Sequence, residues 1–150
     1  MKELIKSLLV EFHKKLPLDC ISREIQLPID TDKIISVCGV RRCGKTFVLF
    51  DTINNLIYNN IAKPEQILFI NFDDERLGLK TNELDLIIES YKELFPMQKM
   101  EDVYIFFDEI QMAYGWEKFV RRIYDSITKK IFISGSNSKL LATEIATSLR

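Results

Sequence analysis

The chain has 150 residues, which fits one domain, and at that length about 68–70% of the unfolded surface can be buried. Hydrophobic residues make up 47% and charged residues 29%, an ordinary globular composition that excludes a disordered chain. The net charge of −1 excludes a global field that would attract nucleic acid, although paired basic residues at 41–42, 121–122 and 129–130 leave a local basic patch open.

The first half of the chain predicts a helix, a strand and a second helix. Residues 2–16 have the pattern of an amphipathic helix, which Pro17 would stop. The apolar run 34–40 is typical of a strand buried on both faces. Residues 46–58 are apolar enough for a buried helix, and the two asparagines that follow favour its end.

The second half continues the alternation. Residues 67–72 and 103–107 are short apolar runs that predict two further strands. The segment 84–95 between them has apolar residues at i, i+3, i+4 and i+7, the pattern of a helix with one buried face, and 116–127 repeats it. A fourth strand is expected at 131–134, and the leucines that follow predict a last helix, capped by Asn137 or Ser138.

The alternation of strands and helices predicts an α/β fold, a parallel sheet sandwiched by helices. We find no repeat, linker or low-complexity stretch, so residues 1–150 are expected to form a single domain. A parallel sheet of this kind normally has at least one strand more. We therefore expect the chain to be the front part of a longer protein.

Cysteine content and apolar run length bear on the compartment. Three cysteines are an odd number without metal-type spacing, which favours free thiols in a reducing compartment. The longest apolar runs have five residues, as in 103–107, far short of the roughly 20 that cross a bilayer. Glu11 also interrupts any signal-like apolar core, so we expect a cytoplasmic protein without membrane contact.

The loop between the first strand and the second helix carries the strongest motif. It matches G-x-x-x-x-G-K-[ST], in which glycines let backbone N–H groups face phosphate oxygens at the amino end of a helix. Lys45 would hold the β- and γ-phosphates from a position that faces solvent without ligand, and Thr46 would bind Mg²⁺. The predicted nucleotide-binding residues are Gly39, Val40, Arg41, Arg42, Cys43, Gly44, Lys45, Thr46 and the adjoining Phe47.

The same loop has two other interpretations. A chance match on a tight turn is expected roughly once in two hundred chains of this length, before the flanking strand and helix are required. A dinucleotide-binding fold is the nearest competitor, but the sequence lacks G-x-G-x-x-G. The motif therefore predicts a site for ATP and magnesium.

The third strand ends in two carboxylates, Asp108 and Glu109. Asp108 is placed to hold the magnesium through water, and Glu109 to polarise the water that attacks the γ-phosphate. The alternative is that one or both cap the following turn. At the end of the fourth strand, Ser136 and Asn137 could sense the γ-phosphate, or could serve only as helix N-caps.

Five segments, in this order, resemble the ATPase domain of prokaryotic AAA-type ATPases that usually carry a carboxy-terminal domain of unknown function. They read GVRRCGKT, NFDDERL, FFDEIQ, GWEKFVRRIYD and FISGSNSKLLATEIATSLR. The resemblance covers about residues 20–150 and implies strand order 5-1-4-3-2, ATP with Mg²⁺, and a phosphate sensor at Ser136 and Asn137. It also implies that Asn71 can hold Glu109 until a partner releases it, unless Asn71 is a plain surface amide.

The resemblance also marks what the chain lacks, namely the fifth strand, a helical lid and the second domain. Residues 1–33 would be a lead-in helix and an adenine-side segment, in which His13 is a solvated residue without function. The function expected is ATP hydrolysis as part of a larger ATPase, weak in this piece alone. The alternative is a nucleotide-gated module that binds ATP with negligible turnover.

Partners follow from the same resemblance. Arg150 lies where AAA-type proteins commonly carry an arginine for the neighbouring subunit, with Arg121 and Arg122 as weaker candidates and surface arginines as the alternative. This leaves open a homo-oligomer of the longer protein. A protein or nucleic-acid partner would bind through the domain beyond residue 150.

Overall fold

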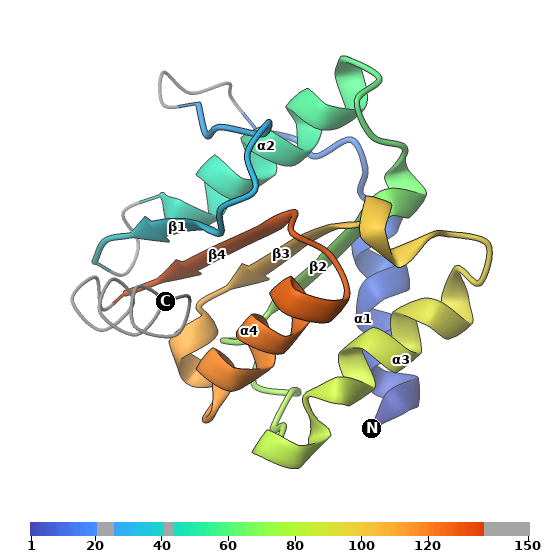
Figure 1. Ribbon diagram of the computed structural model, residues 1–150, viewed down its shortest axis with the longest axis vertical. Coiled ribbons are helices and arrows are strands. Elements are labelled where there is room, and N and C mark those ends of the chain that lie inside the picture. Colours follow the sequence, from blue (N-terminus) through green and yellow to red (C-terminus); the bar gives the residue numbers. More distant parts are fainter. Residues whose placement is uncertain (21–25, 41–43, 137–150) are drawn as a thin grey trace.

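The computed structural model describes residues 1–20, 26–40 and 44–136. Its four strands form one sheet in the order β1-β4-β3-β2, with every neighbouring pair parallel (Figure 1). This is the order implied for strands one to four, and it confirms the α/β prediction. The strands are β1 (Ile35–Cys38), β2 (Ile67–Asn71), β3 (Tyr104–Asp108) and β4 (Ile131–Gly135).

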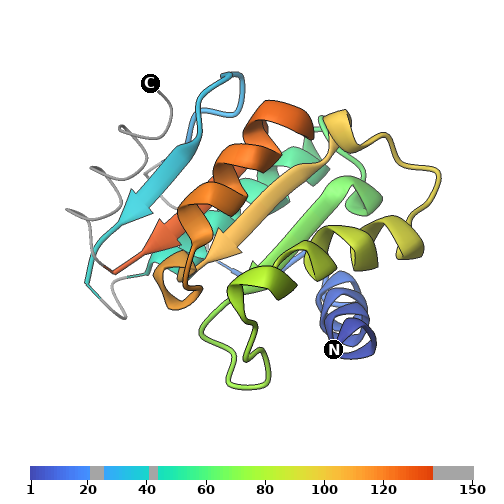
Figure 2. The same cartoon turned by 60° about the horizontal axis from the view of Figure 1, so that its bottom comes forward.

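Helices cover both faces of the sheet. Figure 2 shows α3 and α4 together on one face and α2 on the other. The helices described are α1 (Lys2–His13), α2 (Lys45–Tyr58), α3 (Asp85–Leu94) and α4 (Trp116–Ser126). The predicted helix at 2–16 ends three residues early, at His13, because the residue before Pro17 is disfavoured in helical conformation. The helix predicted near residue 140 lies outside the described residues.

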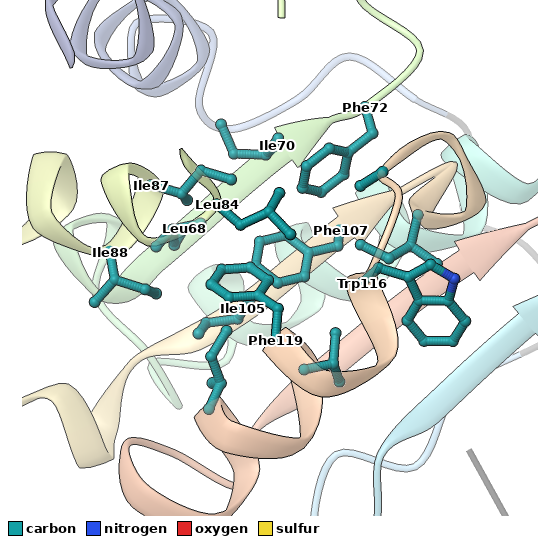
Figure 3. Packing of buried hydrophobic residues seen from close by; sticks show 14 of the residues in the cluster. Leu68, Ile70, Phe72, Leu84, Ile87, Ile88, Ile105, Phe107, Trp116 and Phe119 are labelled. Atoms are coloured by element: carbon teal, nitrogen blue, oxygen red, sulfur yellow. The ribbon is translucent and has the colours of Figure 1, made fainter. Parts of the chain in front are cut away.

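Along β2, β3 and β4, successive side chains point to opposite faces of the sheet. On the face of α3 and α4, Leu68, Ile105 and Phe107 belong to one buried apolar cluster with Trp116 and Phe119 (Figure 3). Phe69, Phe106 and Phe132 point the other way and pack in a second cluster with α2. Continuous apolar strands are thus explained by burial on both faces.

Helix α1 closes the β2 edge of the sheet. Its residues Ile5 and Leu9 are fully buried in the first cluster, whereas Phe12, one turn later, belongs to the second and stacks on Phe69 with ring centroids 4.5 Å apart. The chain is then tied to α2, because the buried Asn54 accepts from Leu18 N–H at 2.8 Å and donates to Leu18 O at 2.7 Å.

His13 is not the solvated residue that its position on the helix predicted. Its ring is half-buried, stacks on Phe95 with centroids 4.9 Å apart, and places Nε2 2.7 Å from Ile67 O. A carbonyl only accepts, so Nε2 carries the proton and donates. Burial lowers the pKa of His13, and the hydrogen bond to Ile67 O and the charge of Glu65 oppose that shift only in part.

This lowered pKa makes stability depend on pH. Below the ordinary pKa of about 6.5, His13 binds a proton in the unfolded chain but stays neutral in the folded protein. Protonation therefore favours the unfolded state, and the free energy of unfolding decreases as the pH falls. We expect stability to fall below pH 6.5 by up to about 1.4 kcal/mol per pH unit from this group. His13→Gln, which keeps an N–H donor, should flatten that part of the urea-unfolding profile. An identical profile in both proteins would contradict the assignment, since the sequence has one histidine.

Candidate functional site

Most predicted site residues that the structure describes lie at the carboxyl ends of β1, β3 and β4, which come together at one edge of the sheet (Figure 1). Parallel pairing sets Cys38 beside Gly135 and Asn71 beside Asp108. Gly39 N–H continues the ladder by donating to Gly135 O at 3.3 Å. Loops at this edge of a parallel sheet are where ligands bind in open α/β folds.

The phosphate loop leads into α2 through Gly44, which has φ 94°. This left-handed conformation is available to glycine without strain, and it turns the chain into the first turn of α2. The helix begins at Lys45, so its amino end, with partial positive charge, faces the loop. The predicted residues Arg41, Arg42 and Cys43 lie outside the described residues.

Lys45 is buried, which corrects the expectation that it faces solvent. Its side chain is 3% exposed, and Nζ donates to Gly39 O at 2.8 Å and Val40 O at 3.1 Å. Its third partner is Glu109 Oε1, at 3.2 Å. An ammonium has three donors, so these partners replace the water that solvent exposure would supply.

Asp108 is a buried carboxylate held by two hydroxyl groups. Thr46 Oγ1 donates to its Oδ2 at 2.7 Å, and Ser134 Oγ donates to its Oδ1. Asp108 is 1% exposed, and it forms no ion pair with any basic side chain that the structure describes. A buried charge is costly unless it is paired or binds a metal. Thr46 and Asp108 therefore fit a hard cation such as Mg²⁺, which favours oxygen ligands.

Glu109 sits in a constrained turn directly after β3. Its φ is 51°, uncommon for a residue other than glycine, and its N–H donates to Ser134 Oγ at 2.9 Å. Ser134 thus holds Asp108 and Glu109 in one arrangement, although sequence reasoning gave it no role. Backbone strain of this kind is often found at functional sites.

Gln111 is the second residue that sequence reasoning missed. Its Nε2 lies 2.6 Å from Glu109 Oε2 and 3.0 Å from Ser136 Oγ, so it joins the predicted base to the predicted sensor. The sequence did contain a signal for Gln111, because this glutamine ends FFDEIQ, one of the segments that carry the family resemblance.

Asn71 lies at the same edge but contacts another group. Its Oδ1 accepts from Asp73 N–H at 2.9 Å, and it makes no hydrogen bond to Glu109 in the described part of the chain. Its role as a restraint on Glu109 stays a prediction.

The remaining candidates are Val40, Phe47, Asn137 and Arg150. Val40 is exposed, and the exposed Phe47 contacts Phe50 edge-on with ring centroids 6.0 Å apart. Asn137 and Arg150 lie outside the described residues.

No preformed metal cage competes with this arrangement. Across residues 1–20, 26–40 and 44–136, no group of three or more His, Cys, Asp or Glu side chains could hold a metal. A cavity of about 620 Å³ lies at the opposite edge of the sheet, near Tyr104 and Lys130, and no candidate residue lines it.

Comparison with known proteins agrees with this geometry. The family model described as AAA domain matches residues 31–150, which include every strand and every candidate site residue. The chain belongs to the AAA domain family. This confirms the resemblance deduced from the five segments, and with it the P-loop class of the fold.

Two relatives of this AAA domain are prokaryotic proteins described as uncharacterized. One, from Methanocaldococcus jannaschii, is 44% identical over 131 residues, which cover 87% of this chain and 27% of the relative. Another, from Haemophilus influenzae, is 37% identical over 120 residues, 80% of this chain and 29% of the relative. The chain thus spans less than a third of either protein. No solved structure matches.

None of the helices in the part of the chain that the structure describes has the length and apolar character needed to cross a bilayer.

Proposed function

We propose that this AAA domain binds ATP with Mg²⁺ through residues 39–47 and hydrolyses it, as one part of a longer, cytoplasmic ATPase. The observation that carries the proposal is the hydrogen bond of Thr46 to the buried Asp108, which no described basic side chain neutralises, next to Lys45 and Glu109. A cation held there would neutralise the charge that gathers on the phosphates during transfer.

Each residue would have a separate task. Lys45 would leave its carbonyl partners and hold the β- and γ-phosphates, while Thr46 and Asp108 hold the metal. Glu109 would accept the proton of the attacking water, and Ser136, with Asn137, would contact the γ-phosphate. Arg150 remains our candidate for completing a neighbouring site in a homo-oligomer, and a protein or nucleic-acid partner would bind through the remainder of the protein.

The second candidate function is a nucleotide-gated module that binds ATP and turns it over negligibly. One observation favours it: both carboxylate oxygens of Glu109 are occupied by protein donors, Lys45 and Gln111. A base so engaged has to be released before it can act.

Calorimetric titration with ATP, with and without Mg²⁺, tests the proposal. We expect binding that tightens with Mg²⁺ and weakens again in Thr46→Ala, because the hydroxyl is a metal ligand. An ATP affinity that changes neither with Mg²⁺ nor with Thr46→Ala would contradict it. Steady-state phosphate release then separates the two functions: sustained turnover supports the ATPase, and tight binding with negligible release supports the module.

A further inference from the structure

Gln111 is placed to control the orientation of Glu109. Its two amide hydrogens are both used, one on Glu109 Oε2 at 2.6 Å and one on Ser136 Oγ at 3.0 Å. The assignment of the amide is fixed by its partner, because an ionised carboxylate only accepts hydrogen bonds and must face the NH₂ group.

The same contact sets the direction of the Ser136 hydroxyl. Since Ser136 Oγ accepts from Gln111, its own hydrogen is free to donate to another acceptor. A phosphate oxygen is such an acceptor. Gln111 therefore links a donor suited to phosphate with the carboxylate of Glu109, across three side chains in direct contact.

The two oxygens of Glu109 are held by groups of different kinds. Oε1 faces the ammonium of Lys45 at 3.2 Å, and Oε2 faces the amide of Gln111. Phosphate oxygens attract an ammonium more strongly than a neutral amide, because hydrogen bonds from a charged donor are the stronger ones. Departure of Lys45 would thus free Oε1 and leave Oε2 restrained.

We propose that Gln111 is the positioning residue of this site. Its hydrogen bond to Oε2 fixes the orientation of the Glu109 carboxylate, while Oε1 becomes the acceptor for the water proton. Because Gln111 also contacts Ser136, it links this orientation to the position of Ser136. The proposal deepens the ATPase function and rests on it. Asn71, which the family resemblance implied for this restraint, is instead bonded to Asp73. The carbonyl oxygen of the same amide, Gln111 Oε1, is buried and has no hydrogen-bond partner in the described residues. Its orientation is therefore determined by the two donor contacts.

Nuclear magnetic resonance tests the contact without turnover. The side-chain amide of Gln111, assigned by its loss in Gln111→Met, should resonate away from the solvated glutamines of the ligand-free protein. It should shift in Glu109→Ala and in Ser136→Ala, and remain shifted when ATP and Mg²⁺ are added. A resonance at the solvated position, or one that neither substitution moves, would overturn the proposal.

Single-turnover phosphate release tests the consequence. Gln111→Met keeps the length of the side chain and removes its donors, so we expect a rate about 10- to 100-fold lower with unchanged ATP affinity, because misplacement by roughly 1 Å can cost about 100-fold. Gln66→Met is the matched control, since the Gln66 amide donates to Asp102 O at 3.0 Å, at the opposite edge of the sheet.

Two groups of outcomes separate this inference from the function on which it rests. In the Glu109→Gln background, adding Gln111→Met should cost nothing further, because a positioning residue has no effect once its base is gone. Additive losses, or a parental rate in Gln111→Met, would contradict the role of Gln111 alone. Absent ATP binding, or a parental rate in Glu109→Gln, would instead contradict the ATPase.

Discussion

Glu109→Gln is expected to lower the rate of ATP hydrolysis by about 10²–10⁴-fold while ATP still binds and persists on the protein. The amide keeps the size of the side chain but has no carboxylate to accept the water proton, and loss of a general base typically has this effect. The measurement is phosphate release in a single turnover, with bound nucleotide quantified in parallel.

The control for this change is Glu101→Gln, which removes one negative charge from an exposed position just before β3, at the opposite edge of the sheet. It should leave the rate within about twofold of the parent, since exposed charges have little effect on a distant site. If Glu109→Gln hydrolyses ATP as fast as the parent, Glu109 only shapes the turn after β3.

Lys45→Ala is expected to weaken ATP binding by roughly 10- to 100-fold, the loss of one charge-assisted contact to phosphate. Because Lys45 is buried against Glu109, the substitution also leaves that carboxylate without its counter-ion. We therefore expect a lower melting temperature as well, which solvent exposure of Lys45 would not have predicted. Calorimetric titration with ATP and Mg²⁺ gives the affinity, and thermal unfolding without ligand gives the stability.

Lys45→Met separates the two effects, because it restores most of the buried volume but not the charge. Affinity should stay as low as in Lys45→Ala, whereas exposed Lys118→Ala on α4 should change neither quantity. Parental affinity in a folded Lys45→Met protein would refute the assignment of Lys45 to the phosphates.

The strands were predictable because each is a continuous apolar run, and burial on both faces follows from that pattern. Their order was not, since it depends on which strands pair, and only the resemblance supplied it. The predicted first strand included Gly39 and Val40, but pairing within β1 ends at Cys38. There the chain leaves the sheet for the phosphate loop.

The site was only partly predictable for a related reason. Local motifs pointed to Lys45, Asp108 and Glu109, but they did not show that the buried Lys45 contacts Glu109, which lies 64 positions later and across the sheet. Ser134 and Gln111 likewise matter through contacts between elements, at 2.9 Å and 2.6 Å from atoms of Glu109. Single-residue chemistry does not reveal such contacts. His13 was misjudged in the same way, because its partners come from β2 and the end of α3.

Within the residues described, the position of α1 leaves only one edge of the sheet, the β1 edge, open to a further strand. Its apolar residues straddle β2, so no further strand can approach on that side without displacing Ile5, Leu9 and Phe12. At the other edge, β1 pairs only with β4 among the described residues, and its outer row of N–H and C=O groups is a template for another strand. A polypeptide that extends this sheet must therefore add beside β1, next to the phosphate loop, where its own residues would come within reach of the nucleotide.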